Sequence, residues 1–173
     1  RWEENVFQAL KSKVEPGVHP DTGAYVTRED GESGARDIAA WYVKLTQEIA
    51  INETHLFGWQ DGVSFGIGGR DVWWGNYSLG YKCQDWTSDL QNSARQLQTS
   101  LLVKGWDLDF HYHNLMYGDT SLLAFHNFAS ATFNGGTTAF GGFEMPDLVL
   151  DPWARSRPDV FAAEAMFHMW RPY

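Results

Sequence analysis

The sequence predicts an α+β protein in which helices come first and an antiparallel sheet follows. In the first half, apolar residues recur every three or four positions, which is typical of amphipathic helices. In the second half they alternate with polar residues, which is typical of strands. The chain has 173 residues and is 43% hydrophobic, so it is long enough for one domain with a buried core. Helices and strands that are separated along the chain favour the α+β class.

Two helices are predicted at the start of the chain. The first has one apolar face and ends at Pro16-Gly17; the face is formed by Trp2, Val6, Leu10 and Val14. Residues 15–34 carry two prolines and four glycines, which indicates a surface connection or a flexible arm. The second helix enters at Ser33-Gly34 and ends near Asn52, and its face is formed by Ile38, Trp41, Tyr42, Leu45 and Ile49. We therefore divide a single domain into an N-terminal helix and loop arm, 1–34, and a main part, 35–173, which holds the candidate site described below.

The middle of the chain changes character twice. Residues 56–81 hold seven glycines and seven aromatic residues without a helical period, so short strands and loops are expected. A central helix is predicted over roughly 84–103, and Lys104-Gly105 ends it in the manner of a glycine C-cap. Cys83, the only cysteine of the chain, would lie at or just before the start of this helix.

The second half is predicted as strands. They cover residues 106–117, 121–133 and 148–150, and Asn134-Gly135-Gly136 is a strong hairpin turn. Pro158-Asp159 is predicted to open a last short helix through Val160, Ala163 and Phe167.

Charge and composition argue against several kinds of protein and partner. The net charge of −9 argues against nucleic acid, because phosphate binding requires a concentrated basic surface. The sequence has no run of eighteen apolar residues, so we expect no membrane span. A single cysteine predicts no internal disulfide. Because the chain begins at Arg1, we expect a trimmed chain, a processed product or a domain of a larger parent polypeptide.

Three residues combine into a candidate catalytic site. Cys83 begins the central helix, His126 lies on the second strand, and Asp151 ends the third strand. A nearby imidazole can take the proton of a thiol and leave a thiolate that attacks a carbonyl carbon. A carboxylate on the far ring nitrogen fixes the tautomer and stabilises the imidazolium. Adjacent antiparallel strands can bring His126 and Asp151 together across 25 positions of sequence.

This order of residues resembles the papain-like thiol superfamily. The Cys–His–Asp order and the segment Leu150-Asp151-Pro152-Trp153 look most like the transglutaminase and glutamine-deamidase branch, and the resemblance covers roughly residues 75–155. It implies a papain-like fold, in which a central helix bearing the cysteine at its N-terminus packs on an antiparallel sheet. It also implies that Cys83 is the nucleophile, His126 the general base and acid, and Asp151 the residue that orients His126.

The resemblance implies an oxyanion hole as well. The backbone N–H of Cys83 would form half of it. Papain carries a glutamine a few residues before its cysteine for the other half, whereas this sequence has none between Gln60 and Cys83. Asn76 is the nearest suitable amide and is the candidate for that role. The aromatic residues Trp73, Trp74, Tyr77 and Trp153 are expected to form walls of the cleft.

The implied function is a thiol-dependent amide hydrolase or acyltransferase that acts on a protein or peptide and needs no cofactor. Proteins of this kind include glutamine deamidases, transglutaminases and cysteine peptidases. Some resemble bacterial toxins or effectors, so we expect a chain that is secreted or delivered into a target cell, and otherwise a cytoplasmic one. A peptidoglycan peptidase or amidase of the same fold is the alternative.

Two alternatives belong to other classes. His111 and His113 are spaced two apart on a predicted strand, so they share a face and can bind one metal ion. His126 or Asp109 would complete that site. The run from Trp59 to Tyr77 can instead form a sugar- or peptide-binding platform without catalysis.

Overall fold

The computed structural model describes residues 1–52, 73–74, 77–78, 83–112, 127–140, 143–153, 157–162 and 165. Its helices are α1 Trp2–Lys11, α2 Arg28–Asn52, α4 Cys83–Ala94 and α5 Gln98–Val103. Its strands are β1 Gly17–Val18, β2 Tyr25–Val26, β3 Trp73–Trp74, β4 Tyr77–Ser78, β5 Trp106–His111, β6 Phe128–Phe133, β7 Thr137–Phe140, β8 Phe143–Pro146, β9 Leu148–Leu150 and β10 Val160–Phe161.

The long helix α2 begins six residues before the predicted entry at Gly34. Thr27 accepts the N–H of Asp30 on its side-chain Oγ1 at 3.1 Å, as an N-cap residue does. Glu29 and Asp30 place negative charge in the first turn, where the helix dipole favours it. The predicted loop over 15–34 is therefore wrong from Arg28 onward. The rest of that segment holds the antiparallel pair β1–β2, whose Val26 lies in the main core.

Two glycines misled the prediction because they serve packing rather than flexibility. A Cβ atom on Gly34 would lie 2.5 Å from Cδ1 of Trp106, and one on Gly31 would lie 2.6 Å from Cγ1 of Val14. The indole Nε1–H of Trp106 donates to the carbonyl of Gly31 at 2.8 Å. Helix α2 can therefore approach β5 closely only where it lacks side chains.

The central helix is two helices rather than one. Helix α4 ends at Ala94, residues 95–97 form a turn, and α5 begins at Gln98. The apolar period continues through the break, with Leu90, Ala94 and Leu101 all buried. The two pieces pack differently: α4 lies against both β6 and β5, whereas α5 lies mainly against β5. The predicted end is confirmed, since Gly105 follows α5 with a positive φ of 84°.

The main sheet has four strands in the order β10-β9-β6-β5, and every neighbouring pair is antiparallel. The turn at Asn134-Gly135 is confirmed, with φ of 48° and 68°. It does not form the predicted hairpin, however, because β6 pairs with β5 and β9, while β7 pairs with β8 in a separate two-stranded sheet. The third predicted strand, Leu148–Leu150, is confirmed as β9.

The predicted last helix is wrong at its start, although Ala165 lies in a short 3₁₀ turn. Val160 and Phe161 form β10 and pair with Leu150 and Val149 of β9. Both residues are β-formers, and the free edge of β9 offers them hydrogen bonds that a short isolated helix would not match. Ala163 and Phe167 lie outside the described residues.

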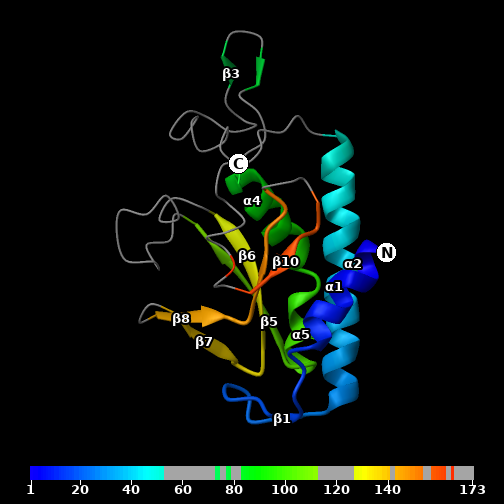
Figure 1. Cartoon of the computed structure of the whole chain (residues 1–173), viewed down its shortest axis with the longest axis vertical. Helices are drawn as coiled ribbons and strands as arrows, with labels where there is room; N and C mark the ends of the chain where they lie inside the picture. The colour runs from blue at the N-terminus through cyan, green and yellow to red at the C-terminus, as the bar shows by residue number, and fades with distance from the viewer. Residues whose placement is uncertain are drawn as a thin grey trace.

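One face of the sheet packs on the helices (Figure 1). The core between the two layers is apolar; it includes Leu10, Ile38, Tyr42, Leu90, Leu101, Trp106, Ala131, Phe133 and Leu150. Residues of the N-terminal 34 positions, such as Val6 and Leu10, belong to this same core. The mixture of helices and antiparallel sheet confirms the α+β class.

Candidate functional site

The structure places Cys83 at the first position of α4, which confirms the predicted start of that helix. Its side chain lies outside the described part of the structure. Two residues later, Asp85 is 5% exposed and lies in the first turn. No role was predicted for Asp85, but a carboxylate here stabilises the positive end of the helix.

Asp151 follows β9 directly and is 2% exposed. Its carboxylate Oδ1 accepts the backbone N–H of Trp153 at 3.1 Å, which closes a short turn over Asp151-Pro152-Trp153. Its own N–H donates to the carbonyl of Asp159 at 3.3 Å. Asp151 is thus both a turn residue and a buried carboxylate at a strand end.

A small apolar cluster joins the start of α4 to the segment after Asp151. Trp86 and Trp153 are 1% and 7% exposed, and both belong to one apolar cluster with Ile49 of α2. Trp86 lies three residues after Cys83, and Trp153 two residues after Asp151. The first turn of α4 and the end of β9 therefore lie at the same corner of the molecule.

His126 lies outside the described residues, two positions before β6 begins. The described neighbour Asn127 is 1% exposed. Strand β6 pairs with β9, and the last pair toward this corner is Ala129 with Leu150. Phe128 and Asp151 are the next residues on the two strands. Asn76 also lies outside the described residues. Trp73, Trp74 and Tyr77 form strands β3 and β4, while their side chains lie outside the described part.

Sequence reasoning missed a buried polar network behind Asp151. The hydroxyl of Tyr42, which is fully buried in α2, donates to the carbonyl of Asp159 at 2.7 Å. Burial raises the pKa of Tyr42 well above its usual value, and the charges of Asp151 and Asp159 raise it further, so the phenol stays a neutral donor. No local sequence pattern predicts the hydrogen bond between Tyr42 and Asp159, because 117 positions separate the two residues.

Asp159 carries the second carboxylate of this network. Its Oδ1 accepts Nε–H of Arg157 at 2.8 Å, and the residue is 9% exposed. Burial raises the pKa of Asp159 above 3.8; the Arg157 contact lowers it in part, and the charge of Asp151 raises it again. A carboxylate with this surrounding takes up a proton more readily than an exposed one.

His111, one half of the alternative metal pair, has other partners. Its Nε2 lies 2.8 Å from the hydroxyl oxygen of Ser130, and its ring stacks on Phe128 with centroids 4.6 Å apart. Burial lowers the pKa of His111, against the opposite effect of Asp109. Within the described residues, His111 belongs to no group of three metal-ligand side chains. His113 lies outside those residues.

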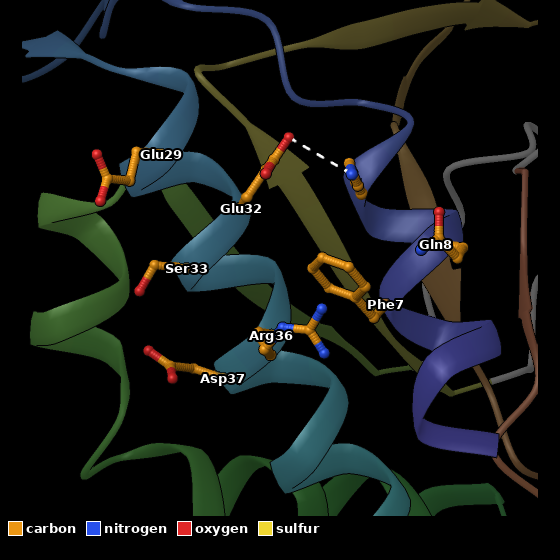
Figure 2. Close-up of a pocket in the computed structure, with 8 residues that line it drawn as sticks. Phe7, Gln8, Glu29, Glu32, Ser33, Arg36 and Asp37 are labelled. Atoms are coloured by element: carbon orange, nitrogen blue, oxygen red, sulfur yellow. Dashed lines mark ion pairs between the residues drawn. The ribbon is translucent and has the colours of Figure 1, made fainter. Parts of the chain in front are cut away.

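A pocket of about 470 Å³ lies elsewhere, between α1 and α2 (Figure 2). Its charged side chains pair locally: Lys11 Nζ lies 3.8 Å from Glu32 Oε1, and the Arg36 guanidinium lies 3.7 Å from the centroid of the Phe7 ring. None of the predicted site residues lines it. We assign it no function.

No protein-family model, no curated protein and no solved structure matches this chain. Among the described helices, none combines the length and the apolar character that crossing a bilayer requires.

Proposed function

We propose that the chain is a thiol-dependent amide hydrolase or acyltransferase of papain-like type. Cys83 is the nucleophile, His126 the base and acid, and Asp151 the residue that orients His126. The observation that supports this most is the apolar cluster of Ile49, Trp86 and Trp153, because it holds the start of the Cys83 helix near the segment that carries Asp151.

Two further features support the proposal. Helix α4 packs on β6, the strand that begins two residues after His126, and β6 pairs with β9, which ends one residue before Asp151. Asp151 is also buried while ionisable, a state that proteins tolerate mainly where a partner or a function requires it. The negative charge of Asp85 in the first turn of α4 disfavours a thiolate at Cys83. His126 therefore has to take the proton from the thiol.

The chemistry follows the acyl-transfer scheme. His126 takes the thiol proton, the sulfur attacks the amide carbonyl carbon, and the amine leaves with that proton. The backbone N–H of Cys83 and the side chain of Asn76 would stabilise the oxyanion. Water then cleaves the Cys83 thioester in a hydrolase, and an amine does so in a transglutaminase. The scheme needs no cofactor.

The expected substrate is a glutamine side chain or a peptide bond in a protein, as for a glutamine deamidase, a transglutaminase or a cysteine peptidase. Peptidoglycan peptides are the alternative. Trp73, Trp74 and Tyr77 would line the approach together with Trp153. A toxin or effector role, with secretion or delivery into a target cell, belongs to the same proposal.

Alkylation of Cys83 by iodoacetamide across pH tests the proposal. Because Cys83 is the only cysteine, mass spectrometry reports its modification without ambiguity. We expect rapid alkylation with an apparent pKa well below the ordinary thiol value of about 8.5, and a return toward that value in His126→Ala. His111→Gln is the matched control, a strand histidine outside the triad, and should leave the profile unchanged. A slow thiol with an ordinary or raised pKa would overturn the proposal.

Turnover gives a second test. Release of ammonia from a glutamine peptide, or cleavage of a peptide, should disappear in Cys83→Ala while the circular dichroism spectrum is kept. Activity that survives this substitution but is lost with a chelator would support the histidine pair instead. Binding without turnover would support the binding module.

A further inference from the structure

We propose that His19, Asp21 and Asp107 form a binding site for a divalent transition cation of the zinc class. One ligand atom from each residue lies within 4.8 Å of the other two. The site joins the β1–β2 segment to the start of strand β5, where Asp107 is the second residue. Figure 1 shows β1 at the lower end of the molecule and α4 in the upper half, so the proposed cation site is separate from the Cys83 corner.

The distance between the first two ligands fits a metal polyhedron. Nε2 of His19 lies 3.5 Å from Oδ2 of Asp107. Zinc lies about 2.1 Å from nitrogen and oxygen ligands, so two ligands of a tetrahedral site are about 3.4 Å apart. The His19 side chain is 1% exposed, yet Nε2 has no hydrogen-bond partner among the described residues. A buried nitrogen without such a partner normally has an explanation, and a cation supplies one.

The turn around His19 fixes the direction of the ring. Nδ1 accepts the backbone N–H groups of Asp21 at 3.2 Å and Thr22 at 3.3 Å, and the His19 N–H donates to Ala24 at 2.8 Å. With Nδ1 as acceptor, the neutral ring carries its proton on Nε2. A cation on Nε2 moves that proton to Nδ1, so the two long contacts from Asp21 and Thr22 must open. Cation binding is therefore coupled to a small change in this turn.

The two carboxylates are free to complete the site. Asp107 is 42% exposed in its side chain, and it alternates along β5 with Trp106 and Leu108, which face the core. Asp21 is exposed, so rotation of its side chain can bring an oxygen closer to Nε2. In the part of the chain that the structure describes, neither carboxylate forms an ion pair with lysine or arginine. Two negative charges beside one neutral imidazole favour a dication, and water completes its coordination.

The donor set selects the class of cation. An imidazole nitrogen suits zinc, nickel and copper, whereas magnesium and calcium prefer oxygen ligands alone. We therefore expect zinc to bind and magnesium not to compete.

Titration calorimetry of the full, untagged chain with zinc chloride tests the site, with magnesium chloride as the comparison. The Cys83→Ser background removes the thiol as a competing ligand. We expect one zinc per chain, and affinity at least about tenfold weaker in Asp107→Asn and in Asp21→Asn. Glu15→Gln removes an exposed carboxylate close by in sequence and should bind like the parent. Absence of saturable zinc binding, or equal binding in Asp107→Asn, would overturn the proposal.

The turn offers a readout that does not depend on affinity. In nitrogen–proton correlation spectra, zinc should shift the amide signals of Asp21 and Thr22, because their acceptor Nδ1 becomes a donor. The same signals should stay in place with magnesium, and with zinc in His19→Ala, provided that this variant keeps its dispersed spectrum. Zinc binding that leaves both amides unshifted would place the cation elsewhere and contradict the assignment.

Discussion

The two ends of the helix–sheet interface differ in what they bury. Where α2 crosses β5, the contact is formed by Gly31, Gly34 and the indole of Trp106, with one buried hydrogen bond. Where α4 begins and β9 ends, the buried residues include Asp85, Asn127, Asp151 and Asp159. Burying polar groups costs free energy unless they are paired. The first region therefore buries a single polar contact in an apolar surrounding, whereas the second buries several polar groups together, each of which needs partners to stay buried.

Among the substitutions proposed here, removal of the Trp106 side chain should have the largest effect on the stability of the protein. Trp106→Ala opens a cavity and leaves the Gly31 carbonyl without its donor, so we expect the free energy of unfolding to fall by about 3–5 kcal/mol. Urea denaturation measures it. Val103→Ala, at a position 76% exposed, is the control and should change stability by less than about 0.5 kcal/mol. The rate of native-state alkylation of Cys83 should be unchanged. A slower rate in Trp106→Ala would mean that packing at the α2–β5 contact affects the reactivity of Cys83.

Asp151→Asn should instead change the reactivity of Cys83 more than it changes stability. Asparagine keeps the Oδ1 acceptor for the Trp153 N–H and removes only the charge. We expect alkylation of Cys83 at neutral pH to slow by on the order of tenfold, because the proposed triad would then lack the charge that orients His126. Asp147→Asn, four residues earlier, keeps its own contact to the Phe133 N–H and should react like the parent. Equal rates in the two variants would remove Asp151 from the proposed triad.

Gly34→Ala probes the close approach of α2 to β5. The added methyl would meet Trp106 at 2.5 Å, which costs more than the roughly 1 kcal/mol that alanine gains in a helix. We expect a net loss of about 1 kcal/mol, measured as a lower denaturation midpoint. At Gly17 the nearest atom would be 3.9 Å away, so Gly17→Ala should not produce this loss. If Gly34→Ala were more stable than the parent chain, the Trp106 side chain would have to move aside at little cost in free energy.

Substitution of Asp159 should have the smallest effect, which would appear only in how the free energy of unfolding depends on pH. Its folded pKa is raised above 3.8 by burial, so its stabilising contribution is present below the unfolded pKa and is lost as pH rises through the folded pKa. Asp159→Asn should flatten the stability curve over this interval. Arg157→Gln should move the interval to higher pH, because Arg157 lowers the Asp159 pKa. Parallel curves for Asp159→Asn and the parent chain would refute this account.

Local patterns in the sequence predicted much of the fold and part of the candidate site. The buried face of α2, the start of α4 at Cys83 and strand β9 before Asp151 all follow from apolar period and turn residues. The predicted face of α1 is confirmed only at Val6 and Leu10, because α1 ends at Lys11, before Val14, and Trp2 is exposed. The break after Ala94 and strand β10 were missed. Each depends on tertiary packing: α4 lies against both β6 and β5 while α5 lies mainly against β5, and β10 needs the free edge of β9. The role of His126 stays a prediction.

By itself, the sequence determined the class of the fold and the order of its main elements, because the period of apolar residues fixes which face of each helix or strand is buried. Only the tertiary structure decided which faces meet. It made Gly31 and Gly34 part of a helix, since Trp106 approaches there. It also buried His19 beside Asp107 and tied Tyr42 to the Asp159 carbonyl across 117 positions. Such contacts depend on how the layers pack together, which the local sequence pattern does not encode.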